Sequence, residues 1–284
     1  MTHQSPSRGP SDAPEPSPRS RRRLLASPAL AGPASNGTDL NGTDLNGVEL
    51  NSGVLAGSHL DLHLEGSALV GVRANGTTAT GDQLVDMKLA GSTVGGEPVN
   101  VRIDGYTRSG DVSRYLVSFR SDRTTGPWQP VCPGGAYAIA LEGSWNADGS
   151  KTRDPSVVTF ACPGGALVKC VDLGYAPWRS TAGGTSLDAT HQACTRAIRA
   201  DYCGNGSPYT QNGNTIDIYD ALGVQADTEE WLPEAEWDEA GASCMSGAAT
   251  RAQVPVTCQA EKLDLACGQP GREGPGRLVV TELP

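Results

Sequence analysis

Residues 191–206, HQACTRAIRADYCGNG, hold the densest group of chemically active side chains in the sequence. Cys194 as a nucleophile with His191 as its base would place the pair three residues apart on one helix, where the side chains stack and do not converge. That chemistry would also leave an odd number of cysteines for disulfides. A zinc site of His191, Cys194 and Cys203 lacks a fourth ligand, and a Ser-His-Asp triad lacks the GxSxG turn. His191 and Asp201 remain the candidate catalytic residues of this segment.

A helix over residues 186–203 would position these side chains. Five of its residues fall on one stripe: Leu187, His191, Cys194, Ile198 and Tyr202. Three others point the other way, towards solvent or a neighbouring acid: Gln192, Arg196 and Arg199. Thr185 is the expected N-cap, with Asp188 three residues later, and Gly204 is the expected left-handed residue that follows the helix. Because a histidine on an apolar stripe is usually a hydrogen-bonded core residue, we interpret His191 as structural.

Other polar residues could form sites of three further kinds. Four acidic residues could supply the paired carboxylates of a glycosidase: Glu234, Glu236, Asp238 and Glu239. Oxygen ligands for calcium could come from Asp217 and Asp220 with Asn212 and Asn214. Three tryptophans could form a platform for sugar stacking: Trp178, Trp231 and Trp237. Each group has a structural alternative, namely a solvated acidic surface, a turn that contains Asn-Gly, and core or anchoring positions.

The cysteine pattern predicts disulfides. None of the eight cysteines forms a CxxC pair, and all follow residue 130: Cys132, Cys162, Cys170, Cys194, Cys203, Cys244, Cys258 and Cys267. Disulfides persist in oxidising compartments, so the pattern predicts export, with reduced cysteines in a cytosolic core as the alternative. The sequence leaves the connectivity open. Our hypothesis pairs Cys132–Cys162, Cys170–Cys194, Cys203–Cys244 and Cys258–Cys267.

Composition favours strands and loops and argues against nucleic acid as a partner. Apolar residues make up 37% of the chain and aromatic residues 5%, whereas Gly occurs 36 times and Pro 20 times. So few apolar residues, together with many turn residues, favour a fold of short strands held by disulfide bonds over a helical bundle. The net charge of −10 is the opposite of what nucleic-acid binding requires. No cofactor or metal is expected.

The N-terminal region divides into two segments. Residues 1–35 are expected to be a disordered tail or an atypical export signal, since they are rich in Pro and Ser and contain SRRRLLASPALAGPAS. No stretch of the chain reaches the roughly 18 apolar residues of a membrane span. Residues 36–72 repeat Leu every five positions, at Leu40, Leu45, Leu50, Leu55 and Leu60. This stretch resembles the pentapeptide-repeat family, which implies a short β-helical coil; a Leu-punctuated linker is the alternative.

The remainder of the chain is predicted to be α+β. Residues 73–161 alternate apolar and polar positions between Asn-Gly, Gly-Gly and Asp-Gly turns, which predicts an antiparallel β-sandwich or small barrel. From residue 162 the period changes, and we expect a disulfide-rich, mainly helical region over 162–284 with a closing strand. Residues 73–284 are expected to be one folding unit.

A resemblance to a family rests on several segments in order. Ala200, Asp201, Tyr202 and Cys203 form the tetrapeptide that names the ADYC-domain family. The segments at 157–178, 216–231 and 234–237 are also similar to that family. The resemblance implies an exported location and a cysteine framework, and it implies no catalytic residues. The chain departs from the family in lacking a clean signal peptide.

These observations lead to one functional hypothesis and two alternatives. We expect a non-catalytic protein that is exported or held in the cell envelope, a structural or binding module for an unknown envelope component or protein, and a monomer. The first alternative is a secreted hydrolase that uses His191 or the acids Glu234, Glu236 and Asp238. The second is a secreted toxin-like or inhibitory protein. A hydrolase should show a cleft where His191 or two carboxylates meet solvent.

Overall fold

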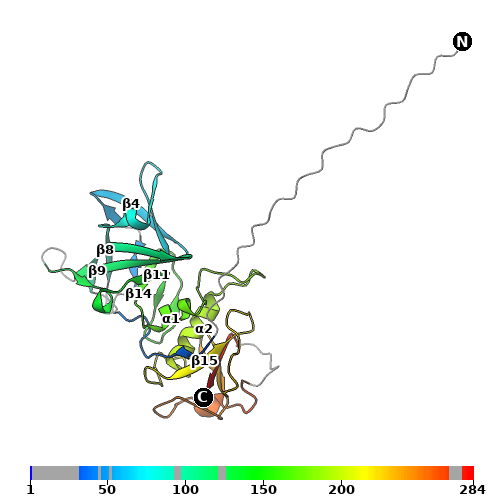
Figure 1. Cartoon of the computed structure of the whole chain (residues 1–284). Helices are drawn as coiled ribbons and strands as arrows, with labels where there is room; N and C mark the ends of the chain where they lie inside the picture. Colours follow the sequence, from blue (N-terminus) through cyan, green and yellow to red (C-terminus); the bar gives the residue numbers. More distant parts are fainter. Residues whose placement is uncertain (2–31, 44–45, 51–52, 93–96, 121–125, 269–276) are drawn as a thin grey trace.

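The computed structural model describes Met1 and residues 32–43, 46–50, 53–92, 97–120, 126–268 and 277–284. Strands dominate this part of the chain, and they form two large antiparallel sheets and one small hairpin (Figure 1). Most of the predicted tail or signal, residues 2–31, lies outside the described residues. Among the described residues, no helix has the length and apolar character needed to cross a bilayer.

The larger sheet has eleven strands and contains the region that was predicted to be antiparallel. Its order is β2 (Val48–Glu49), β14 (Val157–Ala161), β11 (Ala138–Glu142), β9 (Val112–Arg120), β8 (Pro98–Ser109), β7 (Lys88–Ser92), β3 (Gly53–Leu55), β4 (Ser58–Glu65), β5 (Ala68–Val72) and β6 (Thr78–Thr80), with β10 (Gln129–Pro130) paired to β9. Short 3₁₀ turns lie at Gly81–Leu84 and Pro133–Gly135. The antiparallel pairing confirms the prediction from the alternating pattern.

This sheet folds over on itself around the apolar residues of its strands. Alternate residues of β8, Val99, Val101 and Ile103, are buried inside the fold. The two halves of the sheet meet across the core, because the Tyr115 hydroxyl in β9 accepts a hydrogen bond from the backbone N–H of Leu69 in β5 at 2.7 Å. The residues between the halves form one continuous hydrophobic core.

The described residues of 36–72 do not form the predicted pentapeptide coil. They contribute antiparallel strands to the larger sheet, with Gly53 opposite Leu60 and Leu62 opposite Gly71. Two leucines of the repeat, Leu50 and Leu60, are buried, and Leu40 and Leu55 are partly buried. The physical reason is that SHLDLHLE over 58–65 alternates with period two, and antiparallel pairing gives its backbone polar groups partners within two hairpins.

The expectation of a mainly helical region over 162–284 was wrong. The helices there are α1 (Ala166–Asp172), α2 (Asp188–Arg199) and α3 (Gln259–Lys262). A five-stranded sheet accompanies them, in the order β1 (Ala34–Ser35), β15 (Thr215–Tyr219), β18 (Val279–Leu283), β16 (Leu232–Asp238) and β17 (Gly241–Met245). Ile216 and Ile218 alternate with the polar residues Thr215, Asp217 and Tyr219 in the sequence, and Pro233 would interrupt a helix, so these segments form strands. The predicted closing strand is β18.

Two helices connect the sheets. α2 packs on β16, β17 and β18, and its apolar residues share a core with that sheet. α1 lies on the outer face of the larger sheet, where Leu167 and Val171 join a cluster with Ile139 and Leu141. The hairpin of β12 (Ser144–Trp145) and β13 (Lys151–Thr152) reaches α2, since the indole N–H of Trp145 donates to Gln192 at 2.9 Å. Figure 1 shows the two helices between the sheets.

Candidate functional site

The tetrapeptide at residues 200–203 forms the turn that ends α2. Ala200 adopts a left-handed conformation with φ of 51°, and the Asp201 N–H donates back to the carbonyl of Arg196 at 3.0 Å. The expected caps of the helix were therefore wrong. The N-cap is Leu187, without a side-chain cap, and the helix ends before Gly204 because the chain turns back at once to bring Asp201 to Arg196.

The Asp201 carboxylate is buried and receives hydrogen bonds from both sides of this turn. The Arg196 guanidinium donates to its Oδ2, and the backbone N–H groups of Asn205 and Gly206 lie 3.1 and 3.0 Å from its oxygens. Arg199 adds a longer ion-pair contact of 3.9 Å. Gln192, Arg196 and Arg199 are all buried, so none of them faces solvent. Both arginines meet a neighbouring acid, Asp201, whereas Gln192 bonds Trp145 and Gly149 instead. The carboxylate thus closes the loop after α2 and has no solvent-facing side.

Tyr202 links the same turn to the smaller sheet. Its hydroxyl donates to Glu234 at 2.5 Å, and its ring stacks on that of Trp237 with centroids 5.2 Å apart. Glu234 also accepts from the Thr281 hydroxyl at 2.8 Å and pairs with Arg251 at 3.2 Å. Burial, together with the charge of Glu234, raises the pKa of the Tyr202 hydroxyl above its usual value. The hydroxyl is therefore a fixed hydrogen-bond donor and not a group that exchanges protons near neutral pH.

All eight cysteines form disulfides, as predicted, and two of the four proposed pairs are confirmed. Cys132–Cys162 joins two strand ends, and Cys170–Cys194 joins α1 to α2. The other two pairs were wrong: Cys203 pairs with Cys258, and Cys244 pairs with Cys267. Proximity along the sequence suggested Cys258–Cys267. The strand β17 instead carries Cys244 to Cys267, and the turn after α2 carries Cys203 to the start of α3.

His191 is fully buried on α2, where this helix meets α1. Its Nε2 lies 3.1 Å from the carbonyl oxygen of Leu167, and its ring meets Trp145 edge-on. Burial lowers the pKa of His191 to about 4, so the ring is neutral at physiological pH. Cys194 beside it is bonded to Cys170. His191 and Asp201 have separate sets of partners among the described residues, and neither side chain is exposed to solvent.

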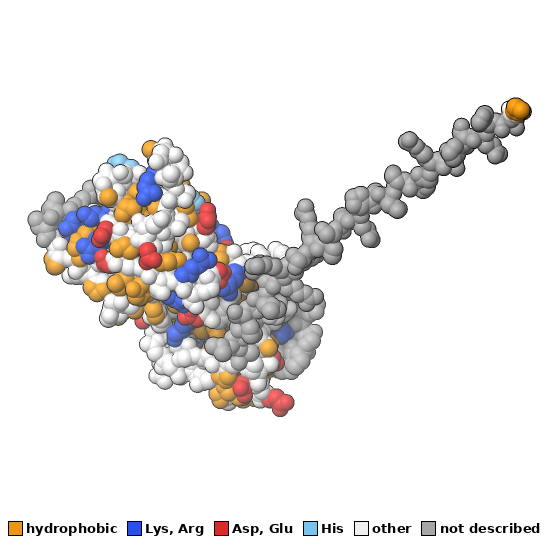
Figure 2. Space-filling view, turned by 45° about the horizontal axis from the view of Figure 1, so that its top comes forward, with side chains coloured by type: hydrophobic (Ala, Val, Ile, Leu, Met, Phe, Trp, Pro, Cys, Tyr) orange, Lys and Arg blue, Asp and Glu red, His pale blue; other side chains and the backbone are white. Residues whose placement is uncertain are grey.

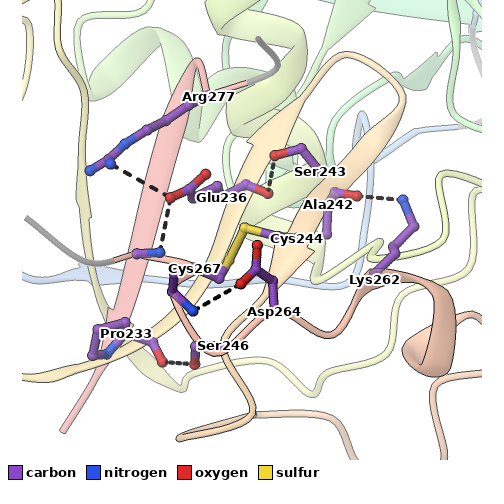
Figure 3. The surroundings of a disulfide bond; sticks show 12 residues. Pro233, Glu236, Ala242, Ser243, Cys244, Ser246, Lys262, Asp264, Cys267 and Arg277 are labelled. Carbon is purple, nitrogen blue, oxygen red and sulfur yellow. Dashed lines mark hydrogen bonds and ion pairs between the residues drawn. A yellow bond between two sulfur atoms is a disulfide. The ribbon is translucent and has the colours of Figure 1, made fainter. Parts of the chain in front are cut away.

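The acidic residues of β16 do not form a pair of catalytic carboxylates. Glu234 and Glu236 are buried, and each has its own partners. Glu236 accepts from the Gly268 N–H at 2.9 Å and lies 3.5 Å from Arg277 (Figure 3). Asp238 accepts from the Ala240 N–H at 2.7 Å in the hairpin turn, and Glu239 contacts Arg153. Each carboxylate serves a different local structure.

The described residues that could bind a metal ion already take part in a disulfide or in hydrogen bonds. Glu236 lies beside Cys244 and Cys267, but these two sulfur atoms are bonded to each other (Figure 3). The predicted calcium ligands receive hydrogen bonds where a cation would need lone pairs. Asp217 accepts from the Thr228 N–H at 2.9 Å, and Asp220 accepts from the Leu222 N–H at 2.7 Å and the Tyr175 hydroxyl at 2.8 Å. Both aspartates close turns.

The tryptophans predicted as a sugar platform lie apart. Trp237 is buried against Tyr202, and Trp231 precedes β16. Trp178 is half-buried, and its indole N–H donates to Asp111 at 3.0 Å. Arg179 also binds Asp111 and lowers the pKa of that carboxyl to about 2. These contacts place Trp178 as an anchor between the β9 end of the larger sheet and the loop after α1.

One partly buried group of an aromatic and two basic side chains was not predicted from the sequence. Trp128 lies against the guanidinium groups of Arg102 and Arg120, which are 4.4 and 4.6 Å from its ring centroid. The signal that could have found them is the outward-facing register of the strands, since Arg102 lies between the buried Val101 and Ile103 and Arg120 follows the partly buried Phe119. The register across strands is not visible in the sequence of either strand alone.

The surface is hollowed where the segment 35–43 crosses between the sheets. One hollow, with a volume of about 450 Å³, is lined by Asn36, Asp39, Lys169 and Asn212. A neighbouring hollow of about 510 Å³ shares Asp39 and reaches Phe119 and Val131. The Lys169 ammonium donates to the carbonyl of Asn36 at 2.6 Å, so its charge holds this crossing segment in place.

Comparison with known protein families places the chain beside one of them. The family model described as the ADYC domain matches residues 81–251, which is more than half of the 284 residues. The match contains both helices α1 and α2 and the turn built around Asp201. No curated protein and no solved structure matches the chain.

Proposed function

The chain belongs to the ADYC domain family, and we propose that it is a non-catalytic, exported protein that acts as a structural or binding module in the cell envelope or the medium. The observation that carries the proposal is the environment of the family tetrapeptide. Each polar residue of the tetrapeptide has a partner inside the fold. Asp201 forms an ion pair with Arg196, Tyr202 donates a buried hydrogen bond to Glu234, and Cys203 forms a disulfide with Cys258. A motif whose groups are all bound inward stabilises a fold and leaves none of them for a substrate.

Export is supported by the four disulfides. Cytosolic proteins of this size seldom carry four disulfides, because cytosolic thiol buffers keep cysteines reduced. Three of the four bonds lie within the smaller sheet and its helices, and each stabilises the fold by typically about 2–4 kcal/mol. A protein that depends on such bonds must reach an oxidising compartment to fold.

Cell fractionation tests the export. The full chain is produced in a Gram-negative bacterium, and intact cells are treated with a maleimide that adds mass to every free thiol. We expect the protein outside the cytoplasmic fraction and without added mass. Chains found in the cytoplasm with several modified cysteines would contradict the proposal. A reduced and denatured sample, which must gain eight labels, is the control.

Substitution of Asp201 tests the structural role of the motif. Removing one partner of a buried ion pair leaves the other charge uncompensated, so we expect D201N to lower the free energy of unfolding by about 3 kcal/mol. The matched control is E65Q, which removes one carboxylate charge from an exposed pair with His63 and should change stability by less than about 1 kcal/mol. Urea denaturation with the disulfides intact measures both. Equal stability of D201N and the parent protein would point to a role in chemistry.

A further inference from the structure

The four disulfides differ in how far solvent can reach them. Cys203 and Cys258 are only partly buried, at the edge of the core that the smaller sheet shares with α2. The other six cysteines have at most 4% of their surface exposed: Cys132, Cys162, Cys170, Cys194, Cys244 and Cys267. A thiolate must contact a sulfur atom to break a disulfide, so burial protects three of the bonds. Cys203–Cys258 is therefore the bond that a reductant can reach in the folded protein.

Two hydroxyl groups lie against the sulfur atom of Cys203. The Tyr209 hydroxyl donates to Sγ at 3.4 Å, and the hydroxyl oxygen of Thr257 lies 3.6 Å from the same atom. A hydrogen-bond donor stabilises a thiolate more than a neutral sulfur atom, because the acceptor then carries a charge. The sulfur atom of Cys203 is therefore the better leaving group of the pair, and the two hydroxyl groups restrict the approach of a nucleophile to it.

The segment that this bond fixes has little apolar attachment to the rest of the fold. α3 contains no buried residue, and its Lys262 donates to the carbonyl of Ala242. Leu263 and Leu265, which follow the helix, are 49% and 83% exposed. Figure 2 shows hydrophobic side chains on the surface at the end of the molecule where the smaller sheet lies. Because few apolar groups are buried here, covalent bonds contribute most of the attachment of α3.

Contacts on both sides of α3 limit what loss of this bond would release. The buried Cys244–Cys267 bond joins β17 to the chain after α3, where the Asp264 N–H donates to the carbonyl of Met245 at 2.9 Å. Arg251, before α3, is buried. Breaking Cys203–Cys258 alone should therefore loosen the loop that contains α3 and leave the smaller sheet intact.

We infer that Cys203–Cys258 is a site of thiol–disulfide exchange with an external dithiol, a property beyond the proposed role as a structural or binding module. A thiolate of the dithiol attacks Sγ of Cys258, and the disulfide bond breaks with its electron pair on Cys203. The second thiol of the reagent then displaces Cys258 from the mixed disulfide. The dithiol becomes a disulfide, and its two electrons and two protons reduce both cysteines. The exchange turns over no substrate, so it is compatible with a non-catalytic protein.

Graded reduction of the folded protein tests the inference. The full oxidised chain is incubated with dithiothreitol without denaturant, and N-ethylmaleimide blocks the free thiols before intact-mass analysis and peptide mapping. We expect a species with labels on Cys203 and Cys258 alone to form at least about tenfold faster than any species with further labels. The variant C203A/C258A should gain no label over the same time, whereas the matched control C132A/C162A should still gain two. The order of labelling in the parent protein decides the test even if a variant fails to fold.

A monothiol identifies the sulfur atom that is attacked. Glutathione has no second thiol to displace the protein from the mixed disulfide, so the first adduct marks the attacked cysteine. After a short incubation with reduced glutathione and blocking with N-ethylmaleimide, peptide mapping should find glutathione on Cys258 and the maleimide on Cys203. We expect this arrangement at least about five times as often as the reverse, since Tyr209 and Thr257 favour Cys203 as the leaving group. A majority of adducts on Cys203 would overturn the assigned direction of attack.

The remaining outcomes are also decisive. First labels on any other pair, or full labelling without an intermediate, would overturn the inference, because reduction would then start elsewhere or require global unfolding. Hydrogen exchange of the doubly labelled protein should be faster in the loop that contains α3 and unchanged in β8 and β9. Unchanged exchange in that loop would overturn its release. Each of these measurements uses purified protein, so failure of the inference leaves the fractionation result, and with it the proposed export, unaffected.

Discussion

At the scale of single residues, His191 couples stability to pH. The pKa of the buried ring is lowered to about 4 from 6.5, because burial disfavours its charged form. Between these pH values the unfolded chain binds a proton that the folded chain does not. The free energy of unfolding therefore stays unaffected by this group above about pH 6.5 and falls by up to roughly 3 kcal/mol as the pH drops to 4.

The variant H191Q isolates this contribution, because glutamine can still donate to the Leu167 carbonyl but does not titrate. We expect the parent protein to lose more stability than H191Q between pH 7.5 and pH 4.5, in urea denaturation at both pH values. Carboxylates that titrate in this range are common to both proteins and cancel in the difference. Parallel losses in the two proteins would show that His191 is protonated in the folded state.

At the scale of elements, the Cys203–Cys258 bond ties the end of α2 to the start of α3. The two cysteines are 55 residues apart, so the bond restricts a long loop in the unfolded chain and stabilises the fold by up to about 4 kcal/mol. We expect C203A/C258A to expose the segment around α3 to limited proteolysis while β8 and β9 stay resistant. The control C132A/C162A removes a bond near the larger sheet and should leave that segment protected. Identical cleavage patterns would contradict this assignment.

Elements whose signal lies within their own sequence could be predicted, whereas elements defined by contacts with distant residues could not. Strands such as β8 and β14 and helix α2 were predictable, because their apolar periods are local properties of the sequence. The strand β16 was not, since its buried Glu234 and Glu236 look like surface acids until Arg251 and Arg277 are brought beside them. The same limit explains the two wrong disulfides and the missed Trp128, whose neighbours come from other strands.

At the scale of the whole molecule, α1 connects the two sheets, because it packs on the larger sheet and contacts α2, which packs on the smaller sheet. Leu167 is buried in the cluster against the outer face of the larger sheet, and its carbonyl accepts the His191 hydrogen bond. We expect L167A to lower the free energy of unfolding by about 3 kcal/mol and to split a single calorimetric transition into two. The half-exposed Leu222 gives the control L222A, which should keep one transition. A single sharp transition for L167A would show that the sheets are coupled by other contacts.

The position of β18 has a consequence for biosynthesis. Residues 279–283 follow every other described strand in the sequence, yet they lie in the middle of the smaller sheet, between β15 and β16. Every cysteine leaves the ribosome or the translocation channel before the strand that brings the halves of that sheet together. Disulfides can therefore begin to form before the smaller sheet is complete, and we expect any wrong early pairs to be corrected by thiol–disulfide exchange.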